Sequence, residues 1–262
     1  MQLTLPAARR KLRPFALLIK PVDYVIDSNT LPAVAADGDT LRMRRTFDAS
    51  NGCERLVQAV VDCAPGRSLS QVVPDGHQEV LYVVSGRGTL EVDGAPHALE
   101  PDTAVFLVAG ERSEVDNPGP EPLVLVGVRA PADREAARGE RRVTVRFADR
   151  PELRADDHRT FRLLVNEDVG CFDVTQFVGI VQPYRAPDHS HPYDEVGYIV
   201  EGEGIAHIAG KQTPIGPGSC FHLPPEEVHC IENTGPAVMR IMGVFHPSGS
   251  PASRSYDAAA GN

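Results

Sequence analysis

Two histidines and a glutamate stand close together in the stretch DHSHPYDEVGYIVEGEG. His189 and His191 are separated by one residue, and Glu195 follows His191 by four positions. Alternate residues of a β-strand point to the same face, so both imidazoles can reach one point. Glu195 has the same parity, but a straight strand would place it about 20 Å from His189. The chain must therefore turn near Pro192 and Asp194. Two imidazoles and one carboxylate at a common point are a ligand set that suits Fe(II) and leaves positions open.

The segment that carries these residues is repeated within the chain. A displacement of 116 residues places Glu79 on Glu195 and Gly119 on Gly235, and the register holds without a gap from residue 79 to residue 120. Upstream the displacement becomes 118, because the first half carries two extra residues before Glu79. Chance does not keep one register through so many turn residues, so the chain contains two copies of one domain.

Each copy has the pattern of many short strands. EVLYVVSGRGTLEVDG and EVGYIVEGEGIAHIAG are β-branched and aromatic runs joined by glycine turns, and the chain has 23 glycines and 23 prolines. This pattern predicts an all-β fold, with an antiparallel sandwich or barrel in each copy. The expected boundaries are an N-terminal extension at 1–39, a first domain at 40–135, a linker at 136–154, a second domain at 155–247 and a tail at 248–262.

The composition is that of a globular protein. The formal net charge is −10, which argues against nucleic acid and anionic membranes as partners. No run of 18 apolar residues occurs in the sequence, so no membrane span is expected. Five cysteines at irregular spacings, without a CxxC pair, predict free thiols in a reducing compartment. We therefore expect a cytoplasmic protein that acts on a small molecule.

The sequence resembles the cupin superfamily. HSHPYDEVGYIVEG matches the first cupin motif, HxHxxxExxxxxxG, at every defining position, and GPGSCFHLPPEEVHCIEN matches the second motif. Because both halves are covered, the chain is similar to bicupins. The resemblance implies two tandem jelly-roll barrels, each a double-stranded β-helix. It also implies one divalent transition metal bound by His189, His191, Glu195 and His229.

The first copy lacks most of these ligands. Its residues at the four ligand positions are Val73, Asp75, Glu79 and Ser113. A carboxylate pair with a serine is a poor site for a transition metal, so we expect the first copy to be metal-free. A weak hard-cation site at Asp75 and Glu79 remains the alternative.

Three further residues are candidates for catalysis or substrate binding. Arg185 precedes the ligands and could hold a substrate carboxylate, although Arg67 at the same place in the first copy favours a structural role equally. Tyr184 is a candidate for the pocket rim. His222 stands where the first copy has Phe106, which suggests either acid–base chemistry near the metal or packing. An apolar wall is expected from Phe177, Ile199, Phe221 and Ile231.

The ligand set allows three kinds of function. We expect an Fe(II) dioxygenase acting on a small organic substrate, because many cupins with these four ligands are dioxygenases. The second hypothesis is a redox-neutral hydrolase, decarboxylase, lyase or isomerase that uses Mn(II), Ni(II), Zn(II) or Fe(II). The chain also resembles ureidoglycine aminohydrolases in length and in its ligand-poor first half, but their ligand pattern, ExHxxxH with a glutamine, differs from HxHxxxE with a histidine. The third hypothesis is a non-catalytic binding protein.

A homodimer is the assembly that exposed jelly-roll edges would favour.

Overall fold

The computed structural model describes residues 23–134 and 141–252, and their regular structure is almost entirely β-strand. The strands form two sandwiches, one in each half of the chain, which confirms the predicted all-β fold with two jelly rolls. Four three-residue 3-10 helices complete the regular elements: η1 (Ser28–Thr30), η2 (Ala49–Asn51), η3 (Phe147–Asp149) and η4 (Glu167–Val169). None of the helices in this part of the chain is long and apolar enough to cross a membrane.

The N-terminal half is built from a six-stranded and a five-stranded sheet. The first sheet contains, in spatial order, β12 (Thr144–Arg146), β9 (Thr103–Val108), β6 (His77–Ser85), β11 (Leu123–Pro131), β3 (Val57–Cys63) and β2 (Leu41–Phe47). The second contains β4 (Gly66–Arg67), β10 (Arg112–Asn117), β7 (Gly88–Val92) and β8 (Ala95–Leu99), with β5 (Gln71–Val72) also on β10. A core of apolar side chains fills the space between them.

The C-terminal half repeats this arrangement. Its larger sheet contains, in spatial order, β1 (Val25–Asp27), β20 (Ser219–Leu223), β17 (Asp194–Glu201), β22 (Met239–His246), β15 (Thr175–Val181), β14 (Arg159–Val165) and β13 (Leu153–Arg154). The smaller sheet contains β16 (Tyr184–Arg185), β21 (His229–Asn233), β18 (Gly204–Ile208) and β19 (Lys211–Ile215).

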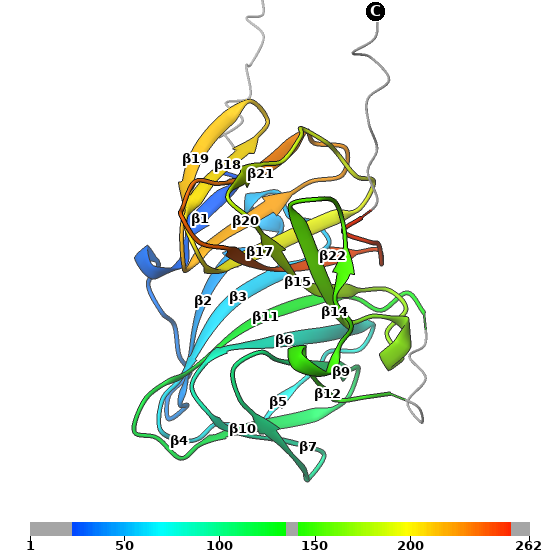
Figure 1. Cartoon of the computed structure of the whole chain (residues 1–262). Helices are drawn as coiled ribbons and strands as arrows, with labels where there is room; N and C mark the ends of the chain where they lie inside the picture. Colours follow the sequence, from blue (N-terminus) through cyan, green and yellow to red (C-terminus); the bar gives the residue numbers. More distant parts are fainter. Residues whose placement is uncertain (1–22, 135–140, 253–262) are drawn as a thin grey trace, which may run out of the picture.

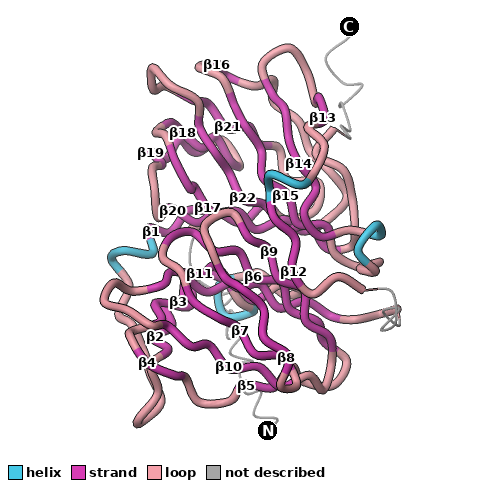
Figure 2. Tube along the Cα trace, turned by 60° about the horizontal axis from the view of Figure 1, so that its bottom comes forward, coloured by secondary structure: helices cyan, strands magenta, loops and turns pink. Residues whose placement is uncertain are grey.

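The two larger sheets face each other across the middle of the molecule (Figures 1 and 2). Their shared core combines side chains of both halves, including Val80, Tyr82 and Val126 from the first and Val178, Val196 and Val244 from the second. Strands β6 and β17 are therefore covered on both faces, and most of their residues are buried. One face of each strand points into its own sandwich and the other into the shared core.

Each half also receives a strand from the other part of the chain. Strand β1, from the segment predicted as an N-terminal extension, pairs with β20 so that Ile26 lies opposite Cys220. Strand β12, from the predicted linker, pairs with β9 so that Val145 lies opposite Ala104. Figure 1 shows β1, in blue, beside the yellow and orange strands of the C-terminal half. The segment before the first domain thus contributes a strand to the C-terminal sandwich, and the segment between the domains contributes a strand to the N-terminal sandwich.

Candidate metal centre

The three ligands of the first motif are brought together by a change of sheet. His189 and His229 lie opposite each other and exchange both backbone hydrogen bonds, at 3.0 and 2.9 Å. After His191 the chain bends at Pro192 and enters the larger sheet, where β17 carries Glu195. This is the turn that the parity argument requires, because it shortens the path between the imidazoles and the carboxylate.

The donor atoms form a compact, buried group. One donor atom each from His191, Glu195 and His229 lies within 4.8 Å of the others, and all three residues are buried. His189 stands beside them, with its ring centroid 4.5 Å from that of His229. Three of the four predicted ligands therefore bring their donor atoms together, and the fourth, His189, lines the same cavity beside them.

All three histidines are held by backbone carbonyls through the same ring nitrogen. Nδ1 of His189, His191 and His229 lies 2.8–3.0 Å from the carbonyl oxygens of Pro187, Tyr193 and Glu227, respectively. A carbonyl only accepts, so in each ring Nδ1 carries the proton and donates it. This leaves the Nε2 lone pair of each neutral ring available to a metal, as in known metal sites where a hydrogen bond at one nitrogen orients the other.

The charges of the group also favour a bound cation. Nε2 of His191 lies 3.0 Å from Oε2 of Glu195, and two acceptors this close need a proton or a metal ion between them. Burial alone would lower the pKa of His191, but the hydrogen bond and charge of Glu195 outweigh it and raise this pKa. Burial and the two neighbouring imidazoles lower the pKa of His229 to about 3, so its ring stays neutral. The donor set thus fits a divalent transition metal.

The donors open into a small cavity of about 90 Å³. Its walls are mostly apolar, as expected, and include the predicted Phe177, Phe221 and Ile231. Ile199 instead packs in the interior core of the same sandwich. The size is well below the several hundred Å³ of pockets for drug-sized ligands, so the cavity suits a substrate of few heavy atoms.

Two facing glycines make room for the aromatic walls. Gly197 of β17 lies opposite Gly243 of β22. A Cβ on Gly197 would approach the Phe221 ring to 2.0 Å, and one on Gly243 would approach Phe177 to 2.4 Å. The first copy has Leu81 in place of Gly197, and Leu81 fills the interior there. The missing side chain is one reason why the C-terminal half has room for a ring at this point.

The cupin domain family matches this chain in two regions, residues 59–129 and 178–245. The two matches together cover more than half of the sequence and correspond to the two sandwiches. The chain belongs to the cupin family. With both regions matched and one sandwich formed by each, it is a bicupin.

Curated relatives match only part of the chain. An oxalate-binding protein of Thermotoga maritima is 38% identical over 58 residues, which are 22% of this chain and 48% of that protein. An uncharacterized protein of Methanocaldococcus jannaschii is 30% identical over 60 residues, again 22% of this chain and 48% of that protein. The chain thus spans about half the length of the curated relatives it matches.

Solved structures share the fold over most of the chain. A glyoxylate-induced protein of Pseudomonas aeruginosa has a TM-score of 0.73 and 18% identity, covering 87% of this chain and 91% of that one. A mutant of oxalate decarboxylase from Bacillus subtilis has a TM-score of 0.68 and 10% identity, covering 87% and 78%. At these identities the likeness concerns the bicupin fold.

One cationic residue of the cavity was not among the predicted site residues. Arg159, the first residue of β14, lines the cavity, and its Nε lies 2.8 Å from Oδ2 of Asp156. The first copy has Leu41 at the equivalent position. Comparing the two copies at the displacement of 118 would have revealed this difference.

The three predicted catalytic residues lie outside the cavity lining. Arg185 is half-exposed and its guanidinium is 3.2 Å from Asp188. Tyr184 stacks on His158 with ring centroids 4.1 Å apart. His222 lies on β20 between Phe221 and Leu223, both of which face the cavity, so its side chain points to the opposite face. Their predicted roles at the metal therefore gain no support from the geometry.

In the first sandwich an ion pair occupies the corresponding place. Oε2 of Glu79 lies 3.3 Å from a guanidinium nitrogen of Arg129, which stands where the second copy has Phe245. Asp75 is exposed and Val73 is buried. Within residues 23–134 and 141–252, neither carboxylate belongs to a group of donors that could hold a metal. The arginine supplies the positive charge that a metal would bring.

Proposed function

We propose that this bicupin is a metal-dependent dioxygenase of a small organic acid. The observation that carries the proposal is the combination, in one small cavity, of the His₃Glu donor set with Arg159 and an apolar wall. A guanidinium can bind a carboxylate through two parallel hydrogen bonds. The aromatic wall then suits an apolar part of the same molecule.

The other residues of the cavity favour oxygenation over acid–base chemistry. Beyond the four ligand residues, the described lining holds one charged side chain, Arg159, and no further carboxylate, imidazole or amine. The Tyr193 hydroxyl donates to the carbonyl of Ser250, and burial together with Glu195 raises the pKa of this phenol. Redox-neutral reactions need a group that moves protons near the operating pH. A dioxygenation in which the substrate provides the electrons mainly needs binding and orientation.

Each residue then has a physical task. Arg159, held by Asp156, orients the substrate carboxylate. Phe177 and Phe245, whose ring centroids are 4.8 Å apart, exclude water from the donors. When bound, Fe(II), the favoured metal, supplies open coordination positions for small ligands.

A redox-neutral reaction is the second candidate. His189 stands beside the three closest donors and could carry a proton if it is not a ligand. The similar proteins named for oxalate and glyoxylate concern small carboxylic acids, and one of them is a decarboxylase. Carboxylate binding without turnover, as the name oxalate-binding protein suggests for that relative, is the third candidate.

A single set of assays distinguishes the three candidate functions. Protein loaded separately with Fe(II), Mn(II), Ni(II) or Zn(II) would be incubated with a panel of small mono- and dicarboxylic acids, including oxalate and glyoxylate. Oxygen consumption that depends on both the acid and iron is the expected result. Equal turnover without oxygen would overturn the dioxygenase in favour of the redox-neutral enzyme. If calorimetry detects binding of an acid but no product forms either with or without oxygen, the protein is a binding protein.

A further inference from the structure

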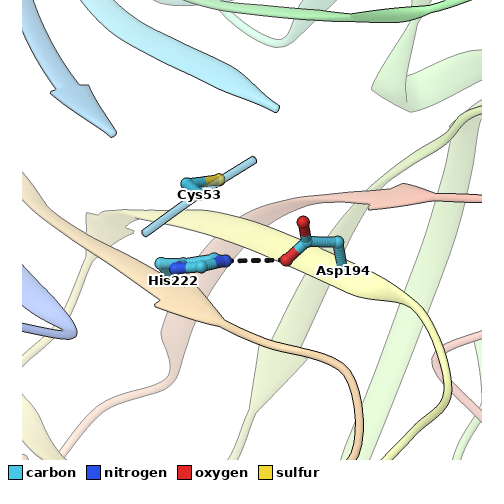
Figure 3. A group of neighbouring side chains, drawn as sticks. All are labelled: Cys53, Asp194 and His222. Atoms are coloured by element: carbon cyan, nitrogen blue, oxygen red, sulfur yellow. Dashed lines mark hydrogen bonds and ion pairs between the residues drawn. The ribbon is translucent and has the colours of Figure 1, made fainter. Parts of the chain in front are cut away.

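A second group of metal-type donors lies between the two halves of the molecule. One donor atom each from Cys53, Asp194 and His222 lies within 4.8 Å of the others, and all three residues are buried. Nε2 of His222 is 2.7 Å from Oδ1 of Asp194, and Nδ1 of this ring has no hydrogen-bond partner in the described part of the chain. Figure 3 shows the thiol, which comes from the N-terminal half, beside the imidazole and carboxylate of β20 and β17.

The repeat offers an internal comparison for this group. Its counterpart across the interface consists of Cys171, Gln78 and Phe106, and Sγ of Cys171 lies 3.3 Å from Oε1 of Gln78. A thiol, an amide and a phenyl ring are all neutral, so that arrangement is a satisfied core contact. The second arrangement keeps the cysteine but replaces the amide by a carboxylate and the phenyl ring by an imidazole. Both changes introduce a metal-ligand type at a buried position.

A third difference between the two copies adds a histidine to the face of the larger sheet that carries Asp194. His246 lies directly across from Asp194 in the pairing of β22 with β17. The first copy has Ala130 at this position. His246 is 1% exposed, and neither of its ring nitrogens makes a hydrogen bond within residues 23–134 and 141–252. The nearest charged group, Oδ2 of the exposed Asp133, lies 3.7 Å from Nε2 of His246, which is beyond hydrogen-bond distance. Buried imidazole nitrogens without a hydrogen bond are costly, and a bound ion would offset that cost.

The group is poorly suited to nucleophilic catalysis. Burial and the charge of Asp194 raise the pKa of the Cys53 thiol to about 12. A reactive cysteine needs a lowered pKa and access to substrate, whereas this thiol is 1% exposed. A metal ion, in contrast, deprotonates a coordinating thiol outright.

We infer that Cys53, Asp194 and His222 bind a second divalent metal ion, of the thiophilic kind represented by Zn²⁺, in a closed structural site. Binding converts the thiol to a thiolate and releases its proton to solvent. His246 is the candidate for the fourth ligand of a tetrahedral site. Because its ligands come from both halves, the ion ties the two cupin domains together. This inference does not depend on the reaction proposed for the cavity.

Cobalt is a suitable probe, because a thiolate bound to Co²⁺ gives a charge-transfer absorption that a site of imidazoles and carboxylates lacks. The full chain would be produced in cobalt-supplied cells, since a buried site is filled as the protein folds. We expect about two equivalents of cobalt, one for each donor group, together with the thiolate band. Cys53→Ser should keep about one equivalent and lose the band.

Three further variants keep the test decisive. The double variant Asp194→Gln, His222→Phe introduces the residues of the first copy, so it leaves no buried carboxylate without its partner, and it should also lose one equivalent and the band. Cys171→Ser changes the counterpart cysteine and should retain both. Glu195→Gln should lose the cavity metal but keep the band, which separates this site from the cavity site. A wild-type protein without the band, or equal cobalt content in wild type and Cys53→Ser, would overturn the inference.

Discussion

Asp194 and Glu195 are neighbours in β17 and face opposite sides of the same sheet. Glu195 points into the cavity and lies 3.0 Å from His191, whereas Asp194 points into the interface and lies 2.7 Å from His222. The alternation of a β-strand thus presents two consecutive carboxylates to two separate imidazole-containing groups. A candidate ligand of the cavity and a contact between the two halves are therefore neighbouring residues in the chain.

Removing the cavity carboxylate should release the cavity metal. We expect Glu195→Gln to lower the metal content by about one equivalent and to abolish turnover, because the amide carries no charge to balance the ion. The protein should also lose the thermal stabilisation that added metal gives to the wild type. Elemental analysis and thermal denaturation with and without metal measure both effects.

Glu79→Gln is the matched control for this change. Glu79 occupies the equivalent position in the first copy and is paired with Arg129. Its replacement should leave the metal content unchanged. Equal metal loss in the two variants would show that the cavity is not the binding site.

Arg159 should determine the affinity for the carboxylate. Charge-assisted hydrogen bonds contribute roughly 1.5–3 kcal/mol, so Arg159→Gln should raise KM for the acid by about 10–150-fold. We expect a smaller effect on kcat if the arginine binds substrate and transition state equally. Steady-state kinetics of the iron-loaded enzyme would measure both constants.

Arg185 provides the comparison for this second prediction. It lies in the same half, but it is half-exposed and paired with Asp188. Arg185→Gln should leave KM within a factor of about two, since exposed ion pairs contribute little. If Arg185→Gln raised KM as much as Arg159→Gln, the carboxylate would be bound elsewhere.

The facing glycines should be intolerant of even one methyl group. In Gly197→Ala the new Cβ would lie 2.0 Å from Phe221, so the ring must move into the cavity. Overpacking of this kind costs about 1–3 kcal/mol, and activity should fall more than stability because the ring would occupy substrate space. Urea denaturation and turnover at saturating substrate separate the two effects.

Gly127→Ala tests whether the loss is specific to the cavity. Gly127 is the counterpart of Gly243, and its Cβ would meet Leu81 at the milder distance of 3.2 Å. Activity should remain close to that of the wild type. A large loss here would mean that any strain in the larger sheets inactivates the enzyme.

The exchanged strands should couple the stability of the halves. Val145 of β12 is 6% exposed and belongs to the shared core, so Val145→Ala should cost about 1–3 kcal/mol. Hydrogen exchange should show that β9 and β20 lose protection together, because both strands border the same interface. Val72→Ala, at a half-exposed position of β5, should change stability by less than about 0.5 kcal/mol. Loss of protection confined to β9 would argue against coupling.

The fold and the candidate metal ligands could be predicted from the sequence because both leave dense local signals. The repeat keeps its register at many glycines and prolines, and the ligands His189, His191 and Glu195 lie within one short segment. The structure confirms this register, since Gln78 faces Ala130 in β6 and β11 as Asp194 faces His246 in β17 and β22.

The remaining features depend on contacts between distant segments. Strands β1 and β12 have three residues each, too few for a periodic pattern, and their partners lie far away in the sequence. The orientation of His222 depends on the register of β20 against β17, which the loop before His229 obscures. Arg159 reaches the cavity only because β14 lies in the same sheet as Glu195, separated from β17 by β22 and β15. Such placements follow from packing, which a single sequence does not display.

The reciprocal strand exchange also bears on how this chain could have arisen. Cys220, opposite Ile26, and Ala104, opposite Val145, are equivalent positions of the repeat, so the two exchanges are related by an approximate twofold axis. Two separate copies with these pairings would form a dimer in which each subunit donates its first strand to the other. The present molecule has the architecture of a strand-swapped dimer whose subunits have become one polypeptide. Within one polypeptide the two copies can differ, and here one carries the candidate metal ligands while the other carries the ion pair of Glu79 and Arg129 at the corresponding place.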